Sequence, residues 1–369
     1  MALFHIKKAF VFHRVVGLNG LNSLKLRRSF ASLKINKTSA ATFSAENLSD
    51  KLFGRDLLNT FQRNTEASRE RSVRVLDKSL VLHILESSIK MMLKEPKILS
   101  INRPIRADGT LGSLSICGDT HGQFLDLANI FHEDIGGYPT AQNPFIFNGD
   151  LVDRGQFSFE GVMSLLAIKL ADPSAVHILR GNHETSDMYE SYGFETEINA
   201  KYDKEVMEKF SELFEALPVA AVLQNEVFVV HGGIGPSSFE CTIKELNTHI
   251  IKRHRSEASF EVFMDLLWSD PTNKVSKFTS SSRGIGYSFG KEITKAFLER
   301  NNLKLLIRSH QVRQGGYDFM HDDKCITVFS APNYCGQCRN NGAIVRFEGE
   351  DMTPSFIVFN AKHYPIKNK

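Results

Sequence analysis

Cysteine, tryptophan and long apolar runs are all scarce in this sequence. Five cysteines and one tryptophan occur in 369 residues. The thiols are too few and too scattered for a disulfide framework, so we expect a reducing compartment. No apolar run reaches the roughly 18 residues that a membrane-spanning helix needs, so no membrane span is predicted. The pair Cys335-x-x-Cys338 alone is a weak signal for zinc or redox chemistry, and we interpret it as two reduced thiols.

Acidic residues are absent before Glu46, whereas eight lysines and arginines occur in the first 45 residues. The whole chain has a net charge of +3, so the part that follows these eight charges is acidic overall. A generally basic surface for nucleic acid is therefore not supported, and no nucleic-acid partner is predicted.

The basic, serine-rich and acid-free start is typical of mitochondrial or plastid transit peptides. The stretch Arg28-Ser29-Phe30-Ala31 also resembles a mitochondrial processing site with cleavage before Ala31. We therefore predict residues 1–45 to be a targeting or disordered leader, which places the protein in mitochondria or another organelle. A disordered basic tail on a protein of the cytoplasm or nucleus is the alternative.

Strand-like and helix-like segments alternate in the rest of the chain, after a polar stretch at 46–74 that we interpret as a linker or arm. Short β-rich apolar runs occur at 111–117, 145–148, 175–179, 227–230, 304–307 and 326–329. Helical patterns occur at 76–93, 123–133, 158–171, 203–216 and 290–300. This alternation predicts one α/β domain over residues 75–369.

Six polar clusters, each directly after a predicted strand, are the most informative feature of the sequence. They read GDTHGQ (118–123), GDLVDRG (149–155), RGNHE (180–184), HGG (231–233), RSH (308–310) and SAPNYCG (330–336). In α/β sheets, functional residues gather in the loops outside the carboxyl ends of strands. Core packing does not explain this repeated placement of metal-ligating side chains, so we expect the clusters to form one site.

The side chains of these clusters are suited to metal binding. The predicted ligands are Asp119, His121, Asp150, Asn182, His231 and His310. Carboxylate, amide and imidazole groups without thiolate favour Mn²⁺, Fe or Zn²⁺. Asp150 is positioned to bridge two ions, and two ions roughly 3.5–4 Å apart hold a hydroxide that attacks a phosphoester directly.

Catalysis of phosphoester hydrolysis also needs a proton for the leaving alkoxide. His183 follows the predicted ligand Asn182 and is the candidate general acid. Asp153 would orient His183 and raise its pKa. Arg154 would bind the phosphate through two parallel hydrogen bonds, a geometry that lysine does not match. We assign no role to His321, which we interpret as a surface or loop residue.

In order and spacing, the six clusters resemble the signature of metal-dependent protein serine/threonine phosphatases, over about residues 100–360. The segments LLWSDP (266–271) and ITKAFLERNNL (293–303) are most similar to the catalytic domain of type-5 protein phosphatases. The resemblance implies a metallophosphoesterase-like central β-sandwich flanked by α-helices. It also implies two metal ions that share Asp150, and phosphate binding by Arg154 and Arg283 with Tyr334 lining the site.

The predicted function is therefore hydrolysis of phosphoserine and phosphothreonine in phosphoprotein substrates, with regulatory subunits as possible further partners. A phosphoesterase for small substrates and a non-catalytic phosphoprotein-binding module are the alternatives. Type-5 enzymes are expected to carry tetratricopeptide repeats of about 34 residues each, and this sequence shows no such repeat. We therefore expect an enzyme that is constitutively open or separately regulated.

The targeting prediction can be tested with a fusion of residues 1–45 to a fluorescent reporter. Because transit peptides are recognised through their basic, acid-free composition, we expect the reporter to enter an organelle. Fluorescence microscopy with mitochondrial and plastid markers measures this, and replacement of the arginines by glutamate provides the control. A diffuse cytosolic signal from the unmodified fusion would contradict the prediction.

Overall fold

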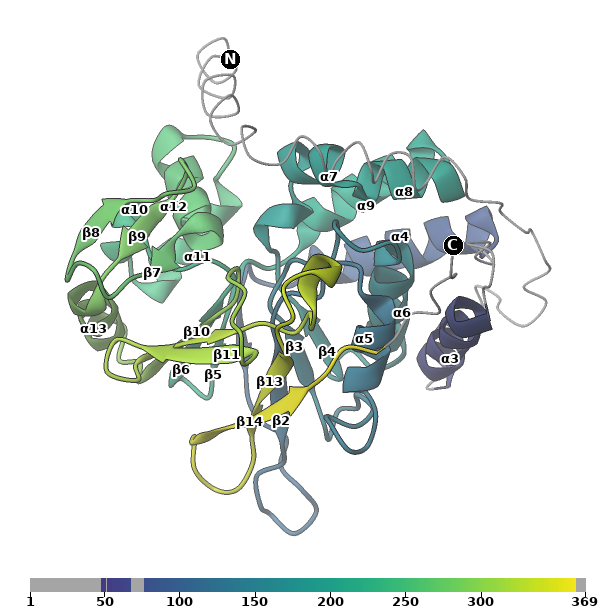
Figure 1. The fold of residues 1–369 in the computed structure, drawn as a ribbon, viewed down its shortest axis with the longest axis horizontal. Helices are drawn as coiled ribbons and strands as arrows, with labels where there is room; N and C mark the ends of the chain where they lie inside the picture. The colour runs from purple at the N-terminus through teal and green to yellow at the C-terminus, as the bar shows by residue number, and fades with distance from the viewer. Residues whose placement is uncertain (1–47, 51, 68–75, 363–369) are drawn as a thin grey trace.

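Two β-sheets pack face to face at the centre of the molecule, and helices cover both outer faces (Figure 1). The computed structural model describes residues 48–50, 52–67 and 76–362, so the predicted leader lies outside the described residues. The arrangement confirms the predicted α/β fold with a central β-sandwich flanked by helices. Within the described ranges, each helix is too short or too polar to cross a membrane.

The first sheet has five strands in the order β14-β13-β2-β3-β4. Their bounds are β2 Leu114–Cys117, β3 Phe145–Phe147, β4 Val176–Ile178, β13 Gly342–Phe347 and β14 Pro354–Phe359. Strands β2, β3 and β4 run parallel, whereas β13 is antiparallel to both of its neighbours. The carboxyl ends of β2, β3 and β4 therefore meet at one edge.

The second sheet has six strands in the order β1-β5-β6-β10-β12-β11. Their bounds are β1 Ile98–Ile101, β5 Ala220–Leu223, β6 Val227–Val230, β10 Leu305–Arg308, β11 Tyr317–Met320 and β12 Cys325–Val328. Strands β6, β10 and β12 run parallel, so this sheet also has an edge at which three carboxyl ends meet.

Successive side chains of a strand point alternately toward the helices and toward the other sheet, which explains the layered arrangement. In β3, Phe145 and Phe147 contact the helices while Ile146 between them packs in the core that the two sheets share. In β6, Phe228 contacts the other helix group while Val229 packs between the sheets. Because successive side chains of a strand point to opposite faces, runs that are apolar at every position indicate strands covered on both sides.

Two groups of helices cover the sandwich (Figure 1). The first comprises α3 Phe53–Ala67, α4 Lys78–Met92, α5 Phe124–Ile130, α6 Ser158–Ala171, α7 Ser186–Tyr192, α8 Phe194–Lys201 and α9 Lys204–Ala216. The second comprises α10 Pro236–Phe239, α11 Ile243–Ile251, α12 Glu257–Trp268 and α13 Lys291–Arg300. A small third sheet accompanies the second group and contains β7 Asp270–Pro271, β8 Phe278–Ser280 and β9 Tyr287–Phe289.

Helix α3 corrects the interpretation of residues 46–74 as a linker or arm. Phe53, Leu57, Leu58 and Phe61 are buried in the core that the first helix group shares with the five-stranded sheet. Phe61 packs edge-on against Phe124 and Phe159, with ring centres 6.2 and 6.0 Å apart. Apolar positions spaced four and eight residues apart form one face of this helix, so the segment 53–67 belongs to the folded domain.

Substitution of Phe61 by alanine tests whether α3 contributes to stability. Phe61 is 1% exposed, so we expect Phe61→Ala to lower the free energy of unfolding by about 3–5 kcal/mol. Denaturant titration followed by circular dichroism measures this change. Asn59→Ala, on the exposed face of the same helix, is the control and should change stability little. A Phe61→Ala variant as stable as the control would show that α3 is dispensable.

Candidate metal centre

The six predicted ligands lie where the two sheets bring their parallel strand ends together. Asp119, Asp150 and Asn182 follow β2, β3 and β4 of one sheet, whereas His231 and His310 follow β6 and β10 of the other. The amide of His310 donates to Asp119 Oδ1 at 2.9 Å, which joins the two sheets. Each of these side chains is buried, so the donors form a closed cluster between the sheets.

Asp150 is at the centre of this cluster. One carboxylate oxygen, Oδ2, lies 3.4 Å from His121 Nε2, which is itself 3.7 Å from Asp119 Oδ2. The other oxygen, Oδ1, lies 3.3 Å from His231 Nε2, which is 3.2 Å from His310 Nδ1. Asp150 therefore faces a separate donor group on each side, as the bridging role requires.

The surroundings of the Asn182 amide oxygen indicate that these groups fit a cation. Its position lies 2.9 Å from both His231 Nε2 and His310 Nδ1 and 3.2 Å from Asp150 Oδ1. If the amide were rotated so that its nitrogen took this place, it would donate to these atoms, whereas with a cation between them the oxygen would act as a ligand. Buried oxygen and nitrogen atoms that face one another in this way are the donor set that a hard or borderline divalent ion prefers.

The backbone selects which nitrogen of two imidazoles faces the cluster. His121 Nδ1 lies 2.9 Å from the Val152 carbonyl, and His231 Nδ1 lies 2.8 Å from the Asn148 carbonyl. Each Nδ1–H therefore donates to a carbonyl, so that each Nε2 faces the cluster. His310 presents Nδ1 instead, and its Nε2 has no hydrogen-bond partner among the described residues.

Burial and the neighbouring charges tune the protonation of these groups. Burial lowers the pKa of His121 to about 3 and that of His310 well below its ordinary value, so both rings are neutral. Burial also opposes ionisation of Asp150, but the nearby imidazole of His231 holds the pKa of that carboxyl well below its usual range. The carboxylate in turn outweighs burial at His231 and raises its pKa to about 9. A cation bound by Asp150 would replace that proton.

The backbone of the cluster is conformationally unusual. Five predicted site residues have left-handed φ angles of 44° to 72°, namely His121, Asp150, Asp153, Arg154 and His310. Such angles cost side chains energy and persist where the surroundings impose them. The backbone is also closely packed here, because a Cβ atom on Gly181 would lie 2.3 Å from the Asp150 nitrogen. Only glycine at 181 allows the two strand ends to lie so close.

His183 and Asp153 form the pair that the sequence predicted. His183 Nδ1 lies 2.6 Å from Asp153 Oδ2, and His183 Nε2 faces the cluster at 4.0 Å from Asp150 Oδ2. The other oxygen of Asp153 accepts from the Phe194 amide at 2.9 Å, so the carboxylate is held at both ends. His183 also lies close enough to His121 and Asp150 for the three side chains to hold one metal ion, although the sequence predicted a role in proton transfer for it.

Arg154 and Tyr334 lie beside the cluster. The Arg154 guanidinium covers the ring of Tyr192 at 3.9 Å, and its buried Nε finds no acceptor in the part of the chain that the structure describes. A buried donor without a partner indicates a place for an external acceptor. The Tyr334 ring lies 5.0 Å from that of His121, and burial raises its pKa well above the ordinary value, so its hydroxyl keeps its proton.

Arg283 is held at the edge of the cluster by residues that sequence reasoning missed. Its Nε donates to Asp270 Oδ2 at 2.6 Å, and its Nη2 donates to the His310 carbonyl at 3.0 Å. The fully buried Arg308 holds the other oxygen of Asp270 at 2.8 Å. Arg308 lies in the RSH cluster and Asp270 lies in the LLWSDP segment. Both segments were identified from the sequence, but neither residue was assigned a role.

Glu184 is a second residue that was missed. Its carboxylate accepts from the amides of Asp150, Leu151 and Gly181 at 2.8 to 2.9 Å. Three hydrogen bonds to a buried carboxylate fix the backbone that carries Asp150. The sequence contained a signal for this residue, because Glu184 is the acidic residue that ends the RGNHE cluster.

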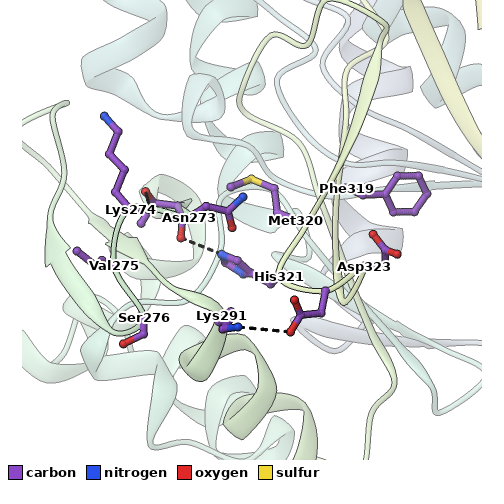
Figure 2. A pocket seen from close by; sticks show the side chains of 11 residues that line it. Asn273, Lys274, Val275, Ser276, Lys291, Phe319, Met320, His321 and Asp323 are labelled. Carbon is purple, nitrogen blue, oxygen red and sulfur yellow. Dashed lines mark hydrogen bonds and ion pairs between the residues drawn. The ribbon is translucent and has the colours of Figure 1, made fainter.

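A hollow of about 460 Å³ lies elsewhere and contains none of the predicted site residues (Figure 2). It lies between segment 272–276, the start of α13 and the turn that follows β11. His321 in its wall is only 4% exposed, and its ring contacts Thr294 Oγ1 at 2.8 Å and the Thr272 carbonyl at 3.1 Å. The interpretation of His321 as a loop residue holds, but it is buried rather than exposed, because both ring nitrogens are paired.

The sequence model of the calcineurin-like phosphoesterases matches residues 113–314, which contain all six predicted ligands. The chain belongs to the calcineurin-like phosphoesterase family. The fold of this phosphoesterase family implies two divalent metal ions, and the donor groups on either side of Asp150 are candidate ligands for them.

Named relatives confirm the resemblance to type-5 phosphatases. Serine/threonine-protein phosphatase T of Trypanosoma brucei brucei is 44% identical over 305 residues, which cover 82% of this chain and 62% of the relative. Serine/threonine-protein phosphatase 5 of Homo sapiens is 46% identical over 252 residues, which cover 68% of this chain and 49% of the relative. The chain therefore spans about half the length of the curated relatives it matches.

A solved structure supports the same relationship. It is a protein serine/threonine phosphatase from Saccharomyces cerevisiae described as similar to human phosphatase PP5. The two structures superpose with a TM-score of 0.71 at 33% identity, and the match covers 79% of this chain and 92% of the yeast chain.

Replacement of Asp150 tests the bridging role. Because its two oxygens face both donor groups, we expect Asp150→Asn to lose both metal ions and the stabilisation that bound metal provides. Elemental analysis of the purified protein and thermal melting with and without a chelator measure these effects. Asp134→Asn, whose side chain is 88% exposed, is the matched control. Undiminished metal content in Asp150→Asn would exclude the bridging role.

Proposed function

We propose that this phosphoesterase is a protein serine/threonine phosphatase that hydrolyses phosphoserine and phosphothreonine. The observation that carries the proposal is the position of a proton donor and a phosphate binder beside one donor cluster. His183 Nε2 faces Asp150, and the unpaired Nε of Arg154 lies next to the same cluster. The names of the relatives support the same reaction.

The phosphate group would be bound by two arginines. The Nε of Arg154 is free to donate, and stacking on Tyr192 holds its guanidinium plane. Arg283 is oriented by Asp270 before any substrate binds. Groups that are already held in place lose little freedom on binding, so they are effective at stabilising the charge that develops on the phosphoryl oxygens.

The leaving alkoxide would take its proton from His183. The Asp153 carboxylate accepts the Nδ1 hydrogen, which directs the Nε2 hydrogen into the cluster. Since the Phe194 amide holds the other oxygen of Asp153, the pair keeps its orientation through the reaction.

Two divalent ions held by Asp119, His121, Asp150, Asn182, His231 and His310 would supply Lewis-acid activation of water and of the phosphoryl group. We propose Mn²⁺, Fe or Zn²⁺ for these positions, because the donors are oxygen and nitrogen without sulfur. The same donor set argues against a non-catalytic binding module, since none of the predicted ligands is missing.

Localisation and regulation are further proposals. The acid-free basic leader supports import into mitochondria or another organelle, where phosphoproteins would be the substrates. Regulatory subunits are proposed as additional partners, because the buried cluster itself recognises phosphate rather than a particular sequence.

The reaction can be tested with a phosphothreonine peptide in the presence of Mn²⁺. Loss of the general acid should lower kcat of His183→Asn by about 10²–10⁴-fold. Stopped assays of released phosphate give kcat and KM, with a nucleoside monophosphate as the competing small substrate. His132→Asn is the control, since its side chain is 64% exposed.

Two outcomes would overturn the assignment. An unchanged kcat in His183→Asn, with metal content preserved, would remove His183 from the mechanism. A higher kcat/KM for the nucleotide than for the peptide would favour the small-substrate phosphoesterase.

A further inference from the structure

Two thiols lie in the loop that carries Tyr334, and they differ from the other three cysteines. Cys335 and Cys338 are exposed, whereas Cys117, Cys241 and Cys325 are buried. Reactivity of a thiol requires access for the attacking reagent, so these two are the accessible thiols of the described residues.

The loop folds into a tight turn that contains both cysteines. The Tyr334 carbonyl accepts from the amides of both Gln337 and Cys338 at 3.1 Å. Residues 334–338 therefore form one compact turn that contains both cysteines, and disulfides span about 4.4–6.8 Å between Cα atoms. The two thiols also interact electrostatically, since Cys338 disfavours ionisation of Cys335.

The position of the turn connects it with the candidate active site. Burial of the sulfur raises the pKa of Cys335, and the nearby Arg154 guanidinium offsets part of that rise, which places the thiol beside the phosphate-binding arginine. Tyr334, the residue before Cys335, packs against His121 and Phe329 with ring centres 5.0 and 5.2 Å apart. A change at Cys335 is therefore transmitted directly to groups that line the phosphate site.

The turn has a conformation that a cross-link would alter. Cys335 has φ 54° and ψ 18°, the left-handed region, and the following Gly336 has φ 68°. Asn340 anchors the loop by accepting from the Tyr334 amide at 2.9 Å and donating to the Ala331 carbonyl at 2.9 Å. Because the loop is anchored on both sides of the cysteines, strain from a cross-link falls on the segment that contains Tyr334.

We propose that Cys335 and Cys338 form a reversible dithiol–disulfide pair that lowers catalysis when oxidised by a small-molecule disulfide. The effect on catalysis rests on the proposed phosphatase function, whereas the thiol chemistry does not.

The reaction balances without a metal or oxygen. The Cys338 thiolate attacks one sulfur of glutathione disulfide, forms a mixed disulfide and releases one glutathione thiolate. The Cys335 thiolate then attacks the Cys338 sulfur, forms the Cys335–Cys338 bond and releases the second glutathione. The protein loses two hydrogens and two electrons, and glutathione disulfide is reduced to two glutathione molecules.

The test uses the full chain loaded with Mn²⁺ and equilibrated in mixtures of reduced and oxidised glutathione. Alkylation followed by peptide mass spectrometry should show loss of the Cys335 and Cys338 thiols together, while the three buried thiols stay reduced. The kcat/KM for the phosphothreonine peptide should fall by about tenfold or more, because small displacements of substrate-positioning groups have effects of that size. Dithiothreitol should restore both the thiols and the activity.

The matched control is the variant Cys335→Ser/Cys338→Ser, which should keep its activity in every glutathione mixture. Equal loss of activity in this variant would overturn the proposal by placing the effect elsewhere. Formation of the disulfide with unchanged kcat/KM would overturn its regulatory role, and failure of the two thiols to pair would overturn its chemistry. If the reduced protein hydrolyses no phosphothreonine peptide while the disulfide still forms, the phosphatase proposal fails and the thiol chemistry stands.

Discussion

The structure depends on the burial of many lone pairs and charges around the Asp150 carboxylate. Buried charges are costly unless each is paired, and here the pairing partners come from both sheets. Glu184 fixes the backbone of Asp150, and carbonyl groups fix the ring nitrogens of His121 and His231. These supporting hydrogen bonds hold the donor groups close together, in an arrangement that a bound cation would stabilise. Five site residues also have left-handed backbone angles, which persist where the surroundings hold them.

The apolar core and the polar site are two consequences of one topology. Parallel strands β2, β3 and β4 end at one edge of the first sheet, and β6, β10 and β12 end at one edge of the second. Packing of the sheets through their Val, Ile and Leu side chains brings these edges together. The hydrogen bond from His310 to Asp119 and the contact of Asp119 with Phe329 then join them. Burial of aliphatic side chains therefore positions the functional groups.

Sequence predicted the parts of this structure that local patterns encode. Helix α6 has the predicted bounds 158–171, and the predicted strands lie within a few residues of the observed ones, because apolar runs and polar breaks mark them. Helix α3 was missed, since its partners Phe124 and Phe159 are far away in the chain. The burial of His321 depends on the distant Thr272 and Thr294 for the same reason. Strands of two or three residues, such as β7 and β8, are too short to show a period.

The spread of the donors along the chain has a consequence for biosynthesis. Donors at Asp119 and His310 are separated by 191 positions and meet only when both sheets have formed. During translation, the five-stranded sheet also waits for β13 and β14, which are made after every ligand. Contacts of such high sequence separation form late and slowly. Binding of metal ions by both donor groups would therefore follow the pairing of strands in the two sheets.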